Sequence, residues 1–293
     1  MKPAAFGYVR PESVEEACAV LAEHGGDAQV LAGGQSLMPL LNLRLARPAL
    51  LVDITRLPDL AGVGGGADVG AVGATTRQRD LEVATALDAV PVLREAVAHM
   101  GSIATRNIGT VGGAVAFGDP VAELPLALVT LGGAVTATSV RGTRRIAGRD
   151  LYSGHYETSL EPDEILTGVS FPIPAPGVGT AFAEVTVRHW GDPTLVLAMA
   201  AVTVADGRCA TVELGLGGVA PTPLLVSGPA GAVLAGDEPT TAAIAAAAES
   251  VTAGLEPPSD VHGSGAYRRR LARHLAARVL SEAFASVSQE VPV

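Results

Sequence analysis

Two short segments, each with a Gly-Gly pair, constrain this sequence more than any other feature. The first is Leu31–Leu37 (LAGGQSL), and the second lies within Met100–Pro120 (MGSIATRNIGTVGGAVAFGDP). Glycine lets the backbone reach positive φ and approach a ligand with no Cβ in between. Consecutive N–H groups in such turns form a concavity that binds anions. We therefore expect two turns, each at the end of a short apolar strand, that together hold one extended diphosphate.

The length and composition are those of a well-packed globular chain. It has 293 residues, of which 48% are hydrophobic and 17% charged, enough for a large core and two or three lobes. The formal net charge of −10 argues against nucleic acid as a partner, because binding to phosphates requires a basic face. We therefore expect no nucleic-acid binding.

The sequence shows neither a targeting signal nor a metal motif. The N-terminus lacks the apolar core of a signal peptide, and the longest apolar stretch, near Leu195–Ala205, is too short to cross a membrane. A cytoplasmic protein without a membrane span is expected. Cys18 and Cys209 lie far apart, so this chain cannot ligate an iron–sulfur cluster in the usual four-cysteine manner, and both are expected to be buried. The histidines have no metal-ligand spacing, and we predict no metal site.

Helix and strand signals near the N-terminus predict a strand–helix–strand unit. Ser13–Glu16 is a capping-box sequence, in which the Ser13 hydroxyl and the Glu16 carboxylate would each accept the other residue's backbone N–H. The helix should run to about His24, and strands are expected at Ala28–Leu31 and Leu50–Ile54. Further along, Thr75–Gln78 is expected to cap a helix that reaches Leu87.

Alternating prolines at Pro172, Pro174 and Pro176 predict a semi-rigid connection and the main domain boundary. The expected domains are a first lobe at 1–56, a second lobe at 57–175 and a C-terminal α+β domain at 176–293.

One glycine cluster matches a dinucleotide pattern in the wrong context. Gly62–Ala67 fits G-x-G-x-x-A, but a Rossmann motif lies between a strand and a helix. Asp68–Val72 instead continues as a strand, which predicts a hairpin. The sequence also has no nucleophile elbow, and its paired carboxylates lie in helix-start or loop contexts. We predict no catalytic residue in this chain and infer a cofactor that carries its own reactivity.

Both glycine segments resemble known cofactor signatures. Ala32–Ile54 (AGGQSLMPLLNLRLARPALLVDI) and Thr105–Pro120 (TRNIGTVGGAVAFGDP) are similar to the two FAD-binding signatures in the flavin (medium) subunits of molybdenum hydroxylases. This family includes carbon monoxide dehydrogenase medium subunits and the flavin domain of xanthine dehydrogenase. The similarity covers essentially the whole chain, including Glu161–Pro174. It implies an α+β fold, with a two-lobed FAD-binding domain of the vanillyl-alcohol-oxidase/PCMH type followed by a small C-terminal domain of sheet and helices.

The resemblance also implies which residues bind FAD. The first loop would hold the diphosphate through its backbone amides and consists of Ala32, Gly33, Gly34, Gln35 and Ser36, flanked by Leu31 and Leu37. The second comprises Thr110, Val111, Gly112, Gly113 and Ala114, approached through Gly101, Ser102, Thr105 and Gly109. Thr110 would donate its hydroxyl to a phosphate, and Glu123 would accept from the ribose or adenosine. Ile165 and Leu166 would pack near the isoalloxazine or the adenine.

Three residues depart from the family pattern. Ala114 stands where Asn or Asp commonly follows the glycine pair, and Glu184 stands where Lys is usual. Pro193 replaces an aromatic residue that often shields the flavin ring. The last two bear on flavin potential and acceptor access.

The function implied by the resemblance is electron transfer within a complex. A large subunit would hydroxylate the substrate at molybdenum, and a small subunit would carry two [2Fe–2S] clusters. FAD in this chain would pass the electrons to NAD, O₂ or a quinone-linked acceptor, and the assembly would be a dimer of heterotrimers. Two alternatives remain open at this point: a free-standing FAD oxidase or reductase, and a scaffold subunit that has lost FAD, which the three departures would favour.

Overall fold

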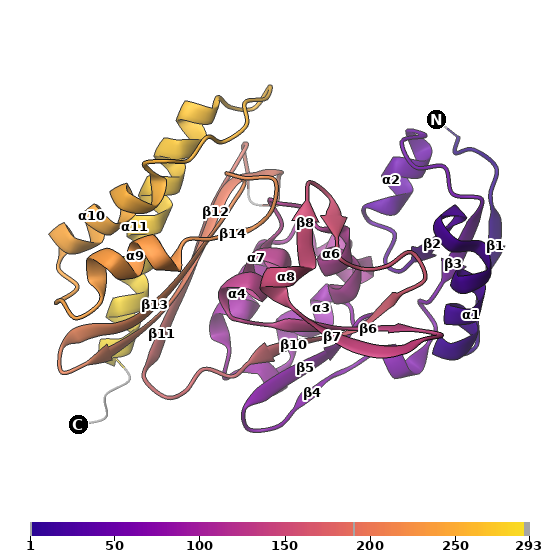
Figure 1. Ribbon diagram of the computed structural model, residues 1–293, viewed down its shortest axis with the longest axis horizontal. Helices are drawn as coiled ribbons and strands as arrows, with labels where there is room; N and C mark the ends of the chain where they lie inside the picture. Colours follow the sequence, from indigo (N-terminus) through magenta and orange to yellow (C-terminus); the bar gives the residue numbers. More distant parts are fainter. Residues whose placement is uncertain (1, 190, 290–293) are drawn as a thin grey trace.

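The computed structural model describes residues 2–189 and 191–289 (Figure 1), so the final four residues of the expected C-terminal domain lie outside the described residues. The chain begins with a parallel three-stranded sheet in the order β1 (Gly7–Val9), β3 (Leu50–Asp53) and β2 (Ala28–Leu31). The helix α1 (Val14–His24) buries Cys18 and Leu21 between this sheet and the rest of the chain. The short η1 (Gly25–Asp27), α2 (Leu37–Asn42) and η2 (Pro58–Leu60) complete this lobe. The predicted strand–helix–strand unit is therefore present.

The start of α1 shows how the capping sequence works. Ser13 Oγ accepts the N–H of Glu16 at 3.1 Å, as expected. The Glu16 carboxylate, however, accepts the N–H of Glu12 at 2.7 Å and not that of Ser13. The helix ends at Gly25, whose positive φ of 52° favours glycine.

The second lobe is built on an antiparallel five-stranded sheet. Its order is β4 (Val63–Gly65), β5 (Val69–Gly73), β10 (Ile165–Pro172), β6 (Ala134–Ser139) and β7 (Gly142–Ala147). The β4–β5 hairpin confirms that Gly62–Ala67 is not a Rossmann turn. The strand β7 was not predicted from the sequence. A small hairpin, β8 (Tyr152–Gly154) with β9 (Glu157–Thr158), lies outside this sheet.

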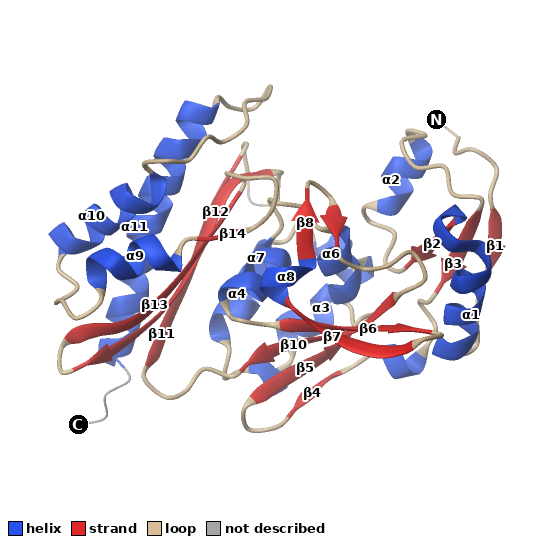
Figure 2. Cartoon of the chain, viewed as in Figure 1, coloured by secondary structure: helices blue, strands red, loops and turns tan. Residues whose placement is uncertain are grey.

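Short helices cover one face of this sheet, as Figure 2 shows. They include α3 (Gln78–Val83), η3 (Thr85–Leu87), α4 (Pro91–His99), α6 (Val111–Phe117), α7 (Glu123–Thr130) and α8 (Gly148–Leu151). The helix α5 (Ile103–Ile108) packs beside α3. The helix predicted to be capped within Thr75–Gln78 begins there, but it ends before the expected Leu87. Its N-cap is Arg77, because the buried Thr76 hydroxyl bonds the backbone of Gly62, and α3 stops at Val83.

The C-terminal unit is a sheet between two groups of helices. The strands β11 (Val178–Thr186), β12 (Thr194–Ala205), β13 (Arg208–Gly217) and β14 (Leu224–Leu225) form it, with α9 (Ser227–Leu234), α10 (Thr241–Thr252) and α11 (Gly265–Gln289) on one face. Alternate side chains such as Phe182 and Met199 point the other way, into the core of the second lobe. The fold is thus α+β, and a seam between β11–β12 and the helices α4 and α7 joins its two parts. No helix in the described ranges is long and apolar enough to cross a membrane.

Candidate cofactor-binding site

The first glycine loop offers a row of unused donors. It leaves β2 at Leu31 and turns through Gly34, at φ 69°, into α2. Within the described residues, the N–H groups from Gly33 to Leu37 have no hydrogen-bond acceptor, and neither has the Ser36 hydroxyl. The Gln35 side chain folds back to donate to Gly33 O at 3.2 Å. Unsatisfied adjacent donors at a strand end are what an anion such as a diphosphate requires.

The second glycine pair lies in a helix and not at the end of a strand, so that part of the sequence prediction was wrong. α5 precedes it, and Gly112 and Gly113 form the first turn of α6 with Thr110 as N-cap. The Gly113 N–H donates to Thr110 Oγ1 at 3.1 Å, and the Gly112 N–H donates to Ala74 O at 2.9 Å. The pair therefore serves close packing: a Cβ on Gly112 would lie 2.5 Å from the Cβ of Ala74.

The two loops are in contact, as the prediction that they hold one diphosphate requires. A Cβ built on Gly33 would lie 2.6 Å from Ile108 O, 2.8 Å from Gly109 Cα and 2.9 Å from Thr110 N. A Cβ on Gly113 would lie 3.6 Å from that of Ala32. Only glycine at position 33 permits the backbones to meet this closely.

A cation that was not predicted as a site residue, Arg77, lies at this contact. Arg77 pairs with Thr110 in an isolated antiparallel bridge, and its guanidinium donates to Ile108 O. No carboxylate in the described part of the chain forms an ion pair with Arg77. A cation beside free amides strengthens the case for a bound anion. Its sequence signal, one Arg after Thr75-Thr76, is too weak to single it out.

The turn before α5 holds the remaining predicted loop residues. Gly101 has φ 48°, and Ser102 caps α5 by accepting the N–H of Thr105 at 3.2 Å. Gly109 packs against the carboxamide of Gln78, whose buried Oε1 has no partner in the described part of the chain. An orphaned acceptor here fits a site completed by a ligand with hydroxyl or N–H groups.

The side chain of Arg106 stabilises this turn through hydrogen bonds to its backbone. Its buried guanidinium donates to Met100 O and Gly101 O, both at 3.0 Å, and pairs with Glu82 at 2.9 Å. We expect Arg106→Met to lower the free energy of unfolding by about 2–4 kcal/mol, because it leaves two buried carbonyls without a donor and removes one of the two cations that pair with Glu82. Arg79 also pairs with Glu82 but is more exposed, so Arg79→Met should cost less than about 1 kcal/mol. Urea unfolding of both variants checks this, and equal losses would contradict it.

Glu123, expected as a hydrogen-bond partner of the ribose or adenosine, begins α7 and is only 7% exposed. Burial raises the pKa of Glu123 to about 8, and the neighbouring carboxyls of Glu184 and Asp119 add to the shift. Its carboxyl is therefore mostly protonated at neutral pH and can donate as well as accept.

Ile165 and Leu166 occupy opposite faces of β10. Ile165 packs with α1 in the core of the first lobe, and Leu166 packs in the core of the second. They are 1% and 6% exposed, respectively. Their contact with a flavin or adenine ring stays a prediction.

The three departures from the family pattern have distinct settings. Glu184 is buried at the seam, where its carboxylate bonds His99 Nδ1 at 3.0 Å and Thr194 Oγ1 at 3.2 Å. The bond between Glu184 and His99 therefore connects β11 with α4. Pro193 O accepts the N–H of Val187 at 3.0 Å, just before β12. Ala114 lies half-buried on α6.

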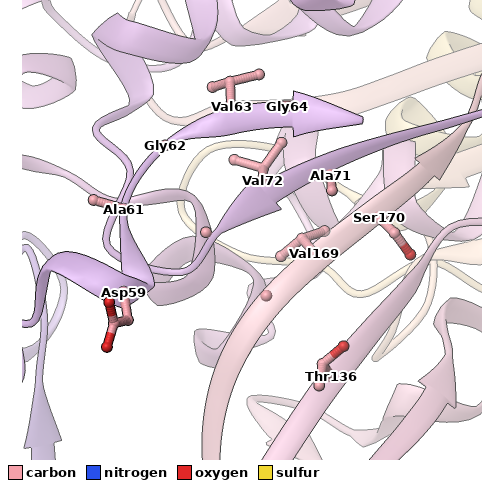
Figure 3. Close-up of a pocket in the computed structure, with 12 residues that line it drawn as sticks. Asp59, Ala61, Gly62, Val63, Gly64, Ala71, Val72, Thr136, Val169 and Ser170 are labelled. Carbon is pink, nitrogen blue, oxygen red and sulfur yellow. The ribbon is translucent and has the colours of Figure 1, made fainter. Parts of the chain in front are cut away.

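A separate groove of about 480 Å³ lies along β4, β5, β10 and β6 (Figure 3). Its lining is mostly Gly, Ala and Val, and Asp59 is the one titratable residue among the lining residues. It offers neither a cation nor a row of free amides. The loops around Gly33 and Thr110 are therefore the better candidate for a diphosphate, although they do not form this groove.

Comparison with known protein families agrees with this geometry. The model for the FAD-binding domain in molybdopterin dehydrogenases matches residues 4–174, and the model for the carbon monoxide dehydrogenase flavoprotein C-terminal domain matches residues 181–283. The chain therefore belongs to the family of FAD-binding medium subunits of molybdenum hydroxylases. Within that family it resembles the carbon monoxide dehydrogenase medium chain.

Individual relatives match along nearly their full length. The medium chain of the carbon monoxide dehydrogenase of Afipia carboxidovorans is 39% identical over 97% of this chain and 98% of its own. Subunit alpha of the 6-hydroxypseudooxynicotine dehydrogenase complex of Paenarthrobacter nicotinovorans is also 39% identical, over 97% and 96%. A solved structure of the carbon monoxide dehydrogenase of Hydrogenophaga pseudoflava, lacking the Mo-pyranopterin moiety, superposes with a TM-score of 0.94 at 34% identity, covering 97% of this chain and 99% of that one.

Proposed function

We propose that this chain binds FAD and is the electron-transfer subunit of a molybdenum hydroxylase complex. It would take electrons from [2Fe–2S] clusters of a partner subunit and deliver them to an external acceptor, which is NAD, O₂ or a quinone-linked carrier. The observation that carries the proposal is the contact between the Gly33 loop, with its free amides, and the Thr110 turn. When bound, FAD supplies the redox chemistry, and the protein supplies binding, orientation and electrostatics.

Each element of the site has a role in binding. The amides from Gly33 to Leu37 and the Ser36 hydroxyl donate to the diphosphate, and Arg77 neutralises part of its charge. The Thr110 hydroxyl accepts from Gly113 and keeps its own proton to donate. Glu123, protonated at neutral pH, hydrogen-bonds the ribose or adenosine.

The partners follow from the family. Relatives are named as medium chains or subunits of complexes whose named substrates differ, from carbon monoxide to 6-hydroxypseudooxynicotine. We propose a molybdopterin-binding large subunit and a [2Fe–2S] small subunit as partners, in a dimer of heterotrimers. Substrate choice then lies outside this chain.

Purification tests this function directly. We expect the chain to carry the visible absorbance of a flavin, and the released cofactor to have the mass of FAD. Substrate of the assembled complex should bleach this absorbance only when the iron–sulfur subunit is present. A colourless chain that takes up no added FAD would contradict the proposal, and turnover by the isolated chain would indicate a free-standing oxidase instead.

A further inference from the structure

Three ionisable side chains lie together at the seam between the two parts of the fold. Glu123 begins α7, Glu184 lies on β11, and His99 is the last residue of α4. At the seam α4 packs against β11, and α7 packs against β12 (Figure 1). All three side chains are largely buried. Buried ionisable groups are costly to keep, and they gather at functional sites.

Hydrogen bonds fix the carboxylate of Glu184. Its Oε1 lies 3.0 Å from His99 Nδ1, and its Oε2 accepts the Thr194 hydroxyl at 3.2 Å. The His99 ring also packs edge-on against Phe182, two residues before Glu184 on the same face of β11, with ring centroids 5.2 Å apart. The Glu184 carboxylate therefore cannot turn away from the seam without breaking contacts in both parts of the fold.

The carboxyl of Glu123 has no such set of donors. In the part of the chain that the structure describes, it accepts only from its own backbone N–H. Burial, with the facing carboxylates of Glu184 and Asp119, raises the pKa of the Glu123 carboxyl to about 8, and Arg106 on α5 opposes the rise. Glu123 therefore keeps its proton at neutral pH and needs an acceptor for it.

The remaining ionisable groups around the seam lie one step further from Glu123. Glu95 on α4 interacts with His99, and with Glu282 and Arg278 of α11. Asp119 interacts with His155 and Tyr156 of the β8–β9 hairpin. The carboxylates that act directly on Glu123 are thus those of Glu184 and Asp119, and Glu184 is the one held from the C-terminal unit.

A protonated Glu123 suits a nucleotide better than an ionised one. FAD brings a diphosphate with negative charge of its own, so a second buried anion in the same site would repel it. The protonated carboxyl can instead donate a hydrogen bond to an oxygen or nitrogen of the ribose or adenine. A neighbour that keeps this proton on Glu123 would therefore favour binding.

We propose that Glu184, held by His99 and Thr194, is a positioning residue for the cofactor: its charge keeps a proton on Glu123, which then donates a hydrogen bond to the ribose or adenine of FAD. This inference rests on the proposed function, because it takes Glu123 as a ligand of FAD. Glu184 itself need not touch the cofactor. The apparent affinity for FAD then falls with the protonated fraction of Glu123.

The pH dependence of FAD affinity tests this role, measured on the full chain after removal of bound flavin. In the wild type the dissociation constant should be about tenfold larger at pH 9 than at pH 7. Glu184→Gln keeps the shape and removes the charge, so its rise should begin about one pH unit lower. Glu123→Gln should show no such rise, because glutamine donates at every pH.

A matched control and a count of protons separate this role from mere loss of structure. Glu213→Gln removes an exposed carboxylate from β13 of the same sheet and should leave the pH profile unchanged. Calorimetry in two buffers of different ionisation enthalpy counts the protons taken up with FAD. The wild type should take up about one at pH 9 and almost none at pH 7, and Glu123→Gln none at either pH.

Two results would overturn the inference: an unchanged pH profile in Glu184→Gln, or no proton uptake by the wild type at pH 9. If Glu184→Gln does not fold, Glu184→Met takes its place, because methionine also lacks the charge and is suited to a buried position. A chain that binds no FAD at any pH would contradict the proposed function. FAD bound equally tightly at pH 7 and pH 9 would overturn only the role of Glu184.

Discussion

Replacement of Gly33 by valine is expected to give a folded protein that retains no FAD. The new Cβ would lie within 3 Å of three backbone atoms of the second loop, Ile108 O, Gly109 Cα and Thr110 N. Backbone cannot move aside as a flexible side chain can, so the two loops must separate. The free amides would then no longer converge with Thr110 and Arg77 on one diphosphate. The ratio of flavin absorbance to protein in the purified variant measures this loss.

Two further variants show whether the effect is local. In Gly26→Val the new Cβ would meet nothing within 4 Å, so its flavin content should match that of the wild type. Gly113→Val should also release FAD, because its Cβ would lie 2.7 Å from Thr110 Oγ1, the cap of α6. Circular dichroism reports whether each variant is folded. A folded Gly33→Val protein with full flavin absorbance would show that the two loops do not bind the cofactor together.

The sequence predicted those parts of the fold whose signals are local. The capping serine and exit glycine of α1, the strands β2 and β3, and the hairpin β4–β5 all follow from residues within a few positions of each other. The first glycine loop belongs to this group as well.

The features that were missed depend on contacts between distant segments. Gly112 was expected to expose its N–H to a ligand, but that group donates to Ala74 O, which no local pattern reveals. Arg106 is buried because Met100 O, Gly101 O and Glu82 surround it. The pairing of Glu184 with His99 joins two domains and likewise has no sequence signal. In each case the structural role of the residue depends on the group that it contacts in a distant segment, which the local sequence does not reveal.

Buried Glu123 is expected to make the flavin-free chain less stable as the pH rises from about 5 to about 8. The folded-state pKa of Glu123 is about 8, against an ordinary value of 4.5. Between these two values the folded chain keeps a proton that the unfolded chain releases, so the free energy of unfolding falls with rising pH and levels off above pH 8. The contribution is about 1.4 kcal/mol for each pH unit, or roughly 4–5 kcal/mol over the whole window.

Glu123→Gln isolates this contribution, because glutamine has nearly the same shape and is neutral at every pH. Subtracting its free energy of unfolding from that of the wild type removes the titration of groups that do not interact with Glu123, such as Glu95, whose pKa burial also raises. In urea unfolding, the free energy of unfolding of the variant minus that of the wild type should increase by several kcal/mol between pH 5.5 and 8.5. Parallel curves would mean that water or a cation reaches the Glu123 carboxylate. Glu123 would then be ionised when a nucleotide binds, and its carboxylate could only accept hydrogen bonds from the nucleotide.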